Sequence, residues 1–297
     1  MRPEIQSLLA ALEGQGYIAD PTIATAVYLS REMQKPLLIE GDAGVGKTEL
    51  ARVLARLLNT ELIRLQCYEG LDVQTALYEW DYPRQLLRLR ISEARGEAPA
   101  DLEEKMFSRD CLLERPLLKA ITRTARPPVL LIDEVDRADD GFEAFLLEVL
   151  SDFQVTIPEL GTIRAEHPPH VVLTSNRSRE LGDALRRRCL YLYMEHPSLE
   201  KEVRIIRTRY PAVRETLARE VGQLLQALRQ RRLVKPPGVA ETLDFTRALL
   251  LLGSEALEAD DVVQTLGCLL KDRHDLQAMN APEIASLLER AREAVQP

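Results

Sequence analysis

The stretch PLLIEGDAGVGKTELARVLARLL, residues 36–58, decides the fold. A short apolar run at 36–40 ends at Gly41, and from residue 49 leucine and valine recur at helical spacing. Between them, residues 41–48 fit the pattern G-x-x-x-x-G-K-[ST]. In this pattern, glycines let backbone N–H groups approach phosphate oxygens with no Cβ in the way. The following helix adds the positive end of its dipole. The stretch therefore predicts a strand, a phosphate-binding loop and a helix in succession.

The residue types in this loop indicate which part of a nucleotide each would contact. Lys47 would reach the β- and γ-phosphates, and the Thr48 hydroxyl would bind Mg²⁺. We therefore expect ATP and Mg²⁺ as ligands, and an incidental glycine turn is the alternative. The expected nucleotide-binding residues in this loop are Gly41, Asp42, Ala43, Gly44, Val45, Gly46, Lys47, Thr48 and Glu49.

Apolar runs alternate with helical segments up to about residue 196. Helical spacing predicts helices over 49–58 and 142–152. Short apolar runs predict further strands at 61–67, 127–134, 170–176 and 189–195. Such alternation is typical of an α/β fold, in which helices cover a parallel sheet.

Two segments depart from this alternation, and a third, over 95–105, has no chemistry proposed for it. Residues 154–165 predict a β-hairpin that turns at 159–161. Residues 68–82 form a mixed acidic and aromatic stretch around Trp80, for which a partner contact and a plain surface loop are equal alternatives. Residues 95–105 are a charged linker or helix edge.

The character of the chain changes at Pro197. Ser198 is a candidate N-cap, and every apolar segment after it has helical period. The pattern predicts three helices near the end of the chain, over 241–252, 260–271 and 282–294. We therefore expect two domains, an α/β domain over 1–196 and an all-helical domain over 197–297.

Two adjacent carboxylates end the predicted strand VLLIDE. In an α/β sheet, ligands bind beyond the carboxyl ends of the strands. Asp133 would then face the Mg²⁺ ion, and Glu134 would polarise a water for attack on the γ-phosphate. The alternative is a pair of charges that cap the following helix.

The order of these motifs resembles the AAA+ ATPases, because a phosphate loop is followed by IDE, TSN and an arginine run. DEVDRAD (133–139), LLEVLSDFQVTI (146–157) and VVLTSN (171–176) are similar to the MoxR family in particular. ELGDALRRRCLYLY (180–193) and GVAETLDFTRALLLL (238–252) resemble the CoxD-like accessory ATPases of carbon monoxide dehydrogenase. The resemblance covers nearly the whole chain.

The resemblance implies a three-layer P-loop NTPase core with a parallel sheet, followed by a small helical lid. It implies an ATP-hydrolysing ring, as a hexamer, that remodels a client protein together with a von Willebrand factor A domain partner. For the CoxD-like branch, the client is a molybdenum hydroxylase of the carbon monoxide dehydrogenase type during metal-site maturation.

The resemblance also assigns roles to single residues. Asn176 corresponds to the first sensor, whose amide positions the attacking water, although Asn is also common as a loop cap at strand ends. One arginine of the run 186–188 corresponds to the finger that enters the neighbouring subunit's nucleotide site. The match favours Arg188, with Arg187 as the second choice, and a solvated run of charges is the alternative.

Two further positions concern the nucleotide pocket. Tyr17 and Ile18 fall where the family lines its adenine pocket. The family's second sensor is an arginine at the start of a lid helix, and here the stretch PPGVAET (236–242) has none. Arg247, further along the predicted helix, is a candidate substitute.

Composition restricts the other functions. The formal charge is −8, and an acidic chain is a poor candidate for general nucleic-acid binding. A nucleic-acid loader therefore remains a weaker alternative, as does a nucleotide switch that does not hydrolyse ATP. A small-molecule kinase is more distant, since no acceptor site is apparent.

The remaining features predict little chemistry. The four cysteines lie far apart in sequence and indicate free thiols. No run of 18 uncharged apolar residues and no signal peptide is present, so we expect no membrane span and a cytoplasmic location. His167 and His170 predict a polar loop rather than a metal site. The cations of RQRR (229–232) predict a solvated helix end, with a contact to an acidic partner surface as the alternative.

Overall fold

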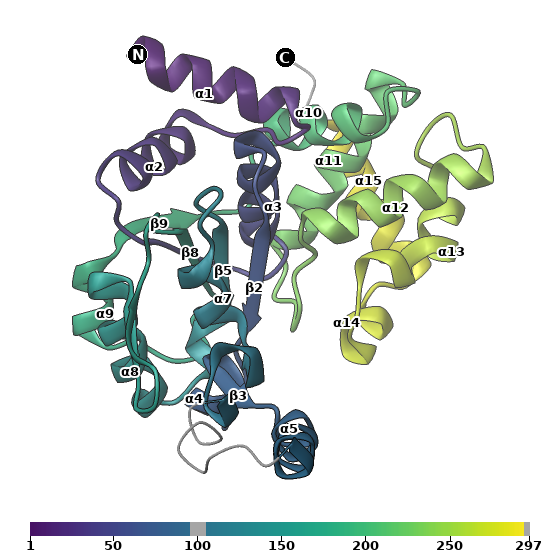
Figure 1. Ribbon diagram of the computed structural model, residues 1–297. Helices are drawn as coiled ribbons and strands as arrows, with labels where there is room; N and C mark the ends of the chain where they lie inside the picture. The colour runs from purple at the N-terminus through teal and green to yellow at the C-terminus, as the bar shows by residue number, and fades with distance from the viewer. Residues whose placement is uncertain (96–104, 294–297) are drawn as a thin grey trace. The chain divides into compact units, whose positions relative to one another are not determined.

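The computed structural model describes residues 1–95 and 105–293 (Figure 1). Most of the charged segment 95–105 and the last residue of the predicted helix 282–294 lie outside these ranges. Two compact units are present. Residues 1–8, 21–40 and 50–193 form the first unit, and residues 9–20, 41–49 and the chain from Met194 onward form the second.

A five-stranded sheet with the order β2-β5-β8-β1-β9 organises the first unit. Its strands are β1 (Leu37–Gly41), β2 (Leu62–Gln66), β5 (Val129–Asp133), β8 (His170–Ser175) and β9 (Leu190–Met194). Strands β2 and β5, β5 and β8, and β8 and β1 pair in parallel. All five residues of β5 are buried, as expected for a central parallel strand. The predicted parallel sheet is confirmed.

Helices follow the strands as the alternation predicts. The α-helices described before β9 are α1 (Pro3–Gly14), α2 (Pro21–Glu32), α3 (Lys47–Leu58), α4 (Val73–Ala76), α5 (Tyr82–Arg95), α7 (Pro116–Thr122), α8 (Asp140–Asp152) and α9 (Asp183–Arg188). Short 3₁₀ turns occupy Arg109–Cys111 and Val135–Arg137. Asp139 caps α8, since its carboxylate accepts from the N–H of Phe142 at 2.8 Å.

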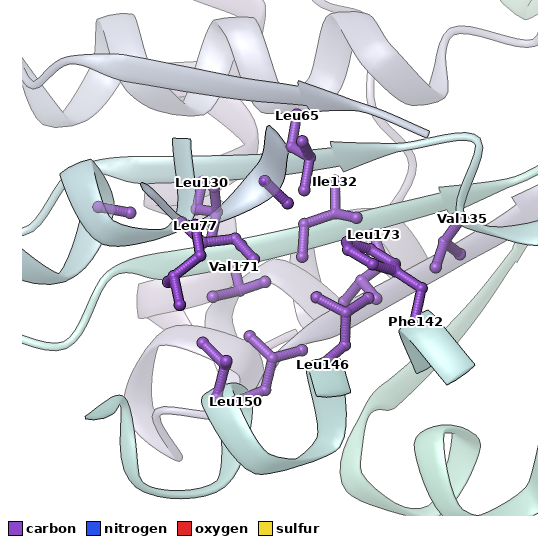
Figure 2. Close-up of a cluster of buried hydrophobic side chains, with 14 of the residues drawn as sticks. Leu65, Leu77, Leu130, Ile132, Val135, Phe142, Leu146, Leu150, Val171 and Leu173 are labelled. Carbon is purple, nitrogen blue, oxygen red and sulfur yellow. The ribbon is translucent and has the colours of Figure 1, made fainter. Parts of the chain in front are cut away.

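The core of the first unit lies where α8 packs on the sheet (Figure 2). Leu130 and Ile132 of β5 project from the same side of their strand, toward Leu146 of α8. Val171 and Leu173 of β8 continue this apolar surface. This packing holds the carboxyl end of β5 in place, where the sequence predicts the two acidic site residues.

Two small sheets lie outside the main one. The hairpin predicted at 154–165 is confirmed as β6 (Gln154–Ile157) and β7 (Gly161–Arg164), which pair antiparallel. The 68–82 stretch is not a plain surface loop, because it contains α4 and strand β3 (Tyr78–Trp80), while the alternative of a partner contact stays a prediction. Strand β3 pairs antiparallel with β4 (Leu112–Glu114), a pairing that the sequence did not reveal.

After β9 ends at Met194, the regular structure of the described residues is helical. Its helices are α10 (Leu199–Arg209), α11 (Glu215–Arg229), α12 (Val239–Leu252), α13 (Ala259–Leu269), α14 (Arg273–Ala278) and α15 (Ala281–Glu293). The predicted N-cap is confirmed, since the Ser198 hydroxyl accepts from the N–H of Lys201. The predicted helix 260–271 ends earlier, at Leu269. The Asp272 carboxylate then caps the separate helix α14.

Candidate functional site

The phosphate-binding loop connects β1 to α3, as predicted. Gly41, Gly44 and Gly46 all have positive φ values, of 155°, 79° and 98°. A Cβ on Gly41 would lie 2.1 Å from the carbonyl oxygen of Met194, so only glycine fits there. The Lys47 side chain is 6% exposed, and its ammonium donates to the carbonyl oxygens of Gly41 and Asp42 at 2.6 and 2.7 Å. The glycines therefore permit the backbone conformation of the loop, and the Lys47 ammonium is hydrogen-bonded to the loop's own carbonyl groups.

Tyr17 and Ile18 are both buried, and Tyr17 touches the loop. The Tyr17 hydroxyl donates to the carbonyl oxygen of Gly46 at 3.5 Å. Burial and the nearby carboxylates of Asp20 and Glu49 raise the pKa of Tyr17 well above its ordinary value, so the phenol stays neutral. The structure thus brings Tyr17 to the loop, while its contact with adenine stays a prediction.

The start of α12 packs directly on the phosphate loop. The Val239 N–H donates to the carbonyl oxygen of Gly44 at 2.8 Å. A Cβ on Gly238 would lie 2.7 Å from the Gly44 Cα, so the two glycines permit this approach. The Glu241 carboxylate accepts from the Gly238 N–H at 3.0 Å. An acidic side chain therefore stands near the loop in the stretch where the family has its second-sensor arginine. Arg247 is exposed, six residues or about 9 Å further along the helix.

His196 adjoins the same loop. Its Nε2 lies 3.4 Å from Oδ2 of Asp42, while its Nδ1 is buried and has no hydrogen-bond partner. Burial, followed by the positive charge of Arg229, lowers the pKa of His196. The neutral imidazole is thus the favoured form in the folded chain. The sequence analysis did not single out this residue.

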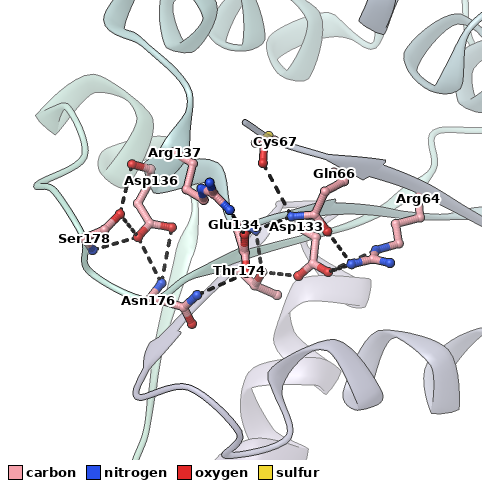
Figure 3. Close-up of polar contacts among 10 residues, drawn as sticks. All are labelled: Arg64, Gln66, Cys67, Asp133, Glu134, Asp136, Arg137, Thr174, Asn176 and Ser178. Carbon is pink, nitrogen blue, oxygen red and sulfur yellow. Dashed lines mark hydrogen bonds and ion pairs between the residues drawn. The ribbon is translucent and has the colours of Figure 1, made fainter. Parts of the chain in front are cut away.

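Asp133 ends β5, and both of its carboxylate oxygens are engaged (Figure 3). Its Oδ2 accepts from Nε and Nη2 of Arg64 at 3.0 and 2.6 Å, and its Oδ1 accepts from the Thr174 hydroxyl at 2.5 Å. The residue is 4% exposed. The carboxylate is therefore buried, ionically paired and oriented by neighbours on β2 and β8.

Glu134 follows in an unusual backbone conformation. Its φ of 54° and ψ of 49° are left-handed, which costs about 1–2 kcal/mol for a residue with a Cβ. The Glu134 N–H donates to the Thr174 hydroxyl at 2.9 Å. Its side chain accepts from Gln66 Nε2 at 3.1 Å, Arg137 Nη1 at 3.2 Å and Asn176 Nδ2 at 3.4 Å. The structure therefore brings together two of the predicted catalytic residues, Glu134 and Asn176.

Asp136 fixes the loop that carries Asn176. The buried Asp136 carboxylate accepts from the Asn176 N–H at 3.2 Å, and from the N–H and hydroxyl of Ser178 at 2.7 and 2.6 Å (Figure 3). This loop follows β8, which lies beside β5 in the sheet. Asp136 thus ties the segment after β5 to the segment after β8.

The three arginines of α9 are not equivalent. Arg186 pairs with Glu40 at 3.3 Å and lies over the Tyr191 ring, 5.7 Å from its centroid. Arg187 and Arg188 are exposed. The two predicted finger candidates, Arg187 and Arg188, therefore lie on the surface, whereas Arg186 is bound to Glu40 of the same chain.

Several residues at this site escaped the sequence analysis. Arg64 and Gln66 stand two apart on β2, so they lie on the same side of the strand. Polar residues at this period near the end of a parallel strand were an available signal. The signal for Asp136 and Thr174 was weaker, because it consisted of their position two residues away from a predicted site residue.

One prediction was wrong for a single residue. RQRR lies at the end of α11 as predicted, and Arg232 is exposed. The Arg229 guanidinium, however, is buried and forms a two-pronged pair with Glu202, at 2.7 and 2.8 Å. Among the described residues, no group of three or more His, Cys, Asp and Glu side chains is placed to hold a metal.

The sequence is similar to a known domain family and to several known proteins. The AAA domain family, dynein-related subfamily, matches residues 36–189, just over half of the chain. The gas vesicle ATPase GvpN1 of Halobacterium salinarum is 26% identical over 247 residues, covering 79% of this chain and 66% of that protein. The chaperone ClpB of Chlamydia trachomatis is 27% identical over 187 residues, covering 60% of this chain and 19% of that protein. The chain thus spans less than two thirds of either relative.

Solved structures show the same fold. A variant of RuvB from Thermotoga maritima superimposes with a TM-score of 0.50 at 18% identity, covering 93% of this chain and 75% of that one. None of the helices in the described residues is long and apolar enough to cross a membrane.

Proposed function

The chain belongs to the AAA domain family, dynein-related subfamily, and we propose that it hydrolyses ATP to remodel a client protein complex. One observation carries this proposal. The Glu134 carboxylate stands next to the buried Asp133 and is held by the side-chain amides of Gln66 and Asn176. A carboxylate held next to a metal-binding carboxylate is suited to activating water.

The phosphate loop would bind the triphosphate. Its backbone N–H groups and the N-terminus of α3 offer donors to the phosphate oxygens, and the Lys47 ammonium would exchange its carbonyl partners for them. Tyr17 and Ile18 would line the adenine pocket. We propose ATP as the nucleotide on these grounds.

The oxygen donors of Thr48 and Asp133 are of the kind that suits a magnesium ion. Mg²⁺ prefers oxygen ligands and takes one or two carboxylates together with substrate phosphates, rather than an all-protein cage. The Thr48 hydroxyl and the Asp133 carboxylate would supply such oxygen ligands. When bound, the ion neutralises negative charge on the phosphates.

Glu134 would act as the general base. It takes a proton from water as the water oxygen bonds to the γ-phosphorus. The bond from that phosphorus to the β,γ-bridging oxygen breaks, which yields ADP and inorganic phosphate. Asn176 orients both the base and the water. The Gln66 amide and the Arg137 guanidinium keep the carboxylate from rotating away.

We propose that the site is completed by a neighbouring copy in a ring, as a hexamer. Arg188, with Arg187 as second choice, is the finger that stabilises charge on the transferring phosphoryl group. Both are exposed, whereas Arg186 is bound to Glu40. In this proposal residues 1–196 form the nucleotide-binding domain and residues 197–297 the lid.

The client is proposed from sequence strings and relatives. Similarity to the chaperone ClpB supports remodelling of proteins, and the stretches 180–193 and 238–252 support the CoxD-like branch. On that basis the client is a molybdenum hydroxylase of the carbon monoxide dehydrogenase type. A von Willebrand factor A domain protein would be the partner, and the cytoplasm the location.

A nucleic-acid machine is the second candidate. It is favoured by one relative, the Holliday junction branch migration complex subunit RuvB of Fervidobacterium nodosum, which is 25% identical over 85% of this chain. The net charge of −8 opposes it. DNA that stimulates ATP turnover in a salt-sensitive manner would favour this candidate over protein remodelling.

A nucleotide switch without hydrolysis is the third alternative. Glu241 stands in the stretch where an arginine would contact the γ-phosphate, which favours slow turnover. Release of the client by non-hydrolysable ATP analogues as efficiently as by ATP would support this alternative.

ATP turnover per subunit, measured over a wide range of protein concentrations, tests the ring. We expect turnover to rise steeply with concentration and Arg188→Ala to abolish the rise. Glu148→Ala, on the exposed face of α8, is the matched control and should behave like wild type. Full turnover by a chain that sizes as a monomer would contradict the shared site.

A further inference from the structure

The side chain that pairs with Asp133 has no role in the function proposed above. Arg64 lies on the neighbouring strand β2, and two of its nitrogens, Nε and Nη2, donate to the same carboxylate oxygen of Asp133 (Figure 3). The Asp133 side chain is 5% exposed, whereas Arg64 is 46% exposed. A buried carboxylate thus has its charge balanced by a cation that reaches in from the surface.

The Arg64 pair is a charged contact of this carboxylate, and a second contact is neutral. The second oxygen of Asp133 accepts from the Thr174 hydroxyl, which carries no charge. A hydroxyl stabilises a carboxylate less than a guanidinium does. The Arg64 guanidinium also contacts the amide oxygen of Gln66, which steadies it over Asp133.

We propose that Arg64 is a positioning residue that occupies the Asp133 carboxylate in place of a divalent cation and makes cation binding there depend on nucleotide. This inference rests on the proposed function, in which Asp133 is a metal ligand. A divalent cation at Oδ2 must displace a charge-assisted pair. Mg²⁺ also gives up its hydration shell reluctantly. Phosphate oxygens supplied by a nucleotide offset both costs, whereas Asp133 alone does not.

The pair also explains how the site keeps its shape. Leaving a buried carboxylate without its cation is strongly destabilising. Arg64 therefore holds the Asp133 carboxylate in one orientation before nucleotide arrives. Because the guanidinium is nearly half exposed, it can swing into water once another cation takes its place.

Binding of Mn²⁺ alone to the full chain, without nucleotide, tests this role. Electron paramagnetic resonance of free Mn²⁺ gives the affinity directly, with no dependence on catalysis. We expect Arg64→Gln to bind Mn²⁺ about tenfold more tightly than wild type, because the competing cation is gone. The double variant Arg64→Gln with Asp133→Asn should lose this gain. Unchanged Mn²⁺ affinity in Arg64→Gln would overturn the proposal.

Melting temperature supplies a second readout. In EDTA, Arg64→Gln should melt below wild type, and Mn²⁺ should raise its melting temperature more than that of wild type. The matched control is Arg115→Gln, which removes an arginine from a pair with the exposed Glu79. It should show wild-type Mn²⁺ affinity. An equal gain in Arg115→Gln would overturn the assignment to Arg64.

If Arg64→Gln does not fold, Arg64→Lys replaces it. Lysine keeps the charge but loses the planar fork, so a gain in Mn²⁺ affinity of about threefold is expected. No gain would overturn the proposal. The proposed function fails separately, if Asp133→Asn leaves ATP turnover and affinity for Mg²⁺·ATP unchanged. A strong dependence of turnover on Asp133, with unchanged Mn²⁺ binding in Arg64→Gln, overturns only the role of Arg64.

Discussion

Replacing Arg229 with methionine should destabilise the helical part of the chain more than any nearby surface substitution. The Glu202 carboxylate has no exposed surface, and its two oxygens accept from Arg229 at 2.7 and 2.8 Å. Removing the guanidinium leaves a buried carboxylate with only neutral donors, such as the Thr242 hydroxyl at 2.8 Å. Breaking one side of a buried pair costs about 3–5 kcal/mol. We expect the free energy of unfolding to fall by that amount.

A matched control lies two residues further on. Arg231 pairs with Glu283 at 3.2 Å, with side chains 35% and 45% exposed. Such a pair contributes about 0–1 kcal/mol, so Arg231→Met should change stability little. Urea unfolding followed by circular dichroism measures both variants, and their difference should be at least about 2 kcal/mol.

A double variant separates the loss of charge pairing from the loss of packing. Replacing both partners, as Arg229→Met with Glu202→Leu, removes the orphaned charge and should recover most of the lost stability. The reasoning is refuted if Arg229→Met costs no more than Arg231→Met. It is equally refuted if the double variant is less stable than Arg229→Met.

Three further outcomes follow from the site. Asp136→Ala frees the loop of Asn176 and should lower ATP turnover about tenfold or more while ATP affinity stays within about threefold; a loss of affinity alone would contradict the positioning role. At pH 8 a thiol reagent should modify Cys268 before Cys67, because burial and nearby carboxylates raise the pKa of the Cys67 thiol to about 12; the reverse order would contradict the burial. Burial lowers the pKa of His196, so the unfolded chain binds its proton more readily and stability falls as the pH drops below about 6.5. His196→Gln should reduce this loss, seen in urea midpoints between pH 5 and 7, and an unchanged slope would count against the lowered pKa.

The sheet and phosphate loop were predictable because their signals are local. Each strand is an apolar run, and the loop motif is eight consecutive residues between a strand and a helix. The pairing of β3 with β4 was not predictable, because each strand has three residues and the partners are more than thirty residues apart. Strands this short carry no usable alternation.

Ion pairs between residues far apart in sequence limited how much of the site could be predicted. Arg64 is 69 residues from Asp133, and a single arginine on a strand predicts only a solvated face. Arg229 was misassigned for the same reason, since a charge run usually faces water. The better signal was Glu202, which shares the inward face of α10 with Val203 and Ile206. An acid on an apolar helix face requires a cation nearby.

Retention of ATP by Glu134→Gln tests the central claim most directly. The glutamine preserves the size of the side chain and its contact with Asn176 but cannot take a proton from water. After mixing with radiolabelled ATP and removal of free nucleotide, we expect the variant to hold intact ATP. Its turnover should be about 10²–10⁴-fold below wild type. Wild-type turnover by Glu134→Gln would contradict the account, because the Glu134 carboxylate would then not be the base.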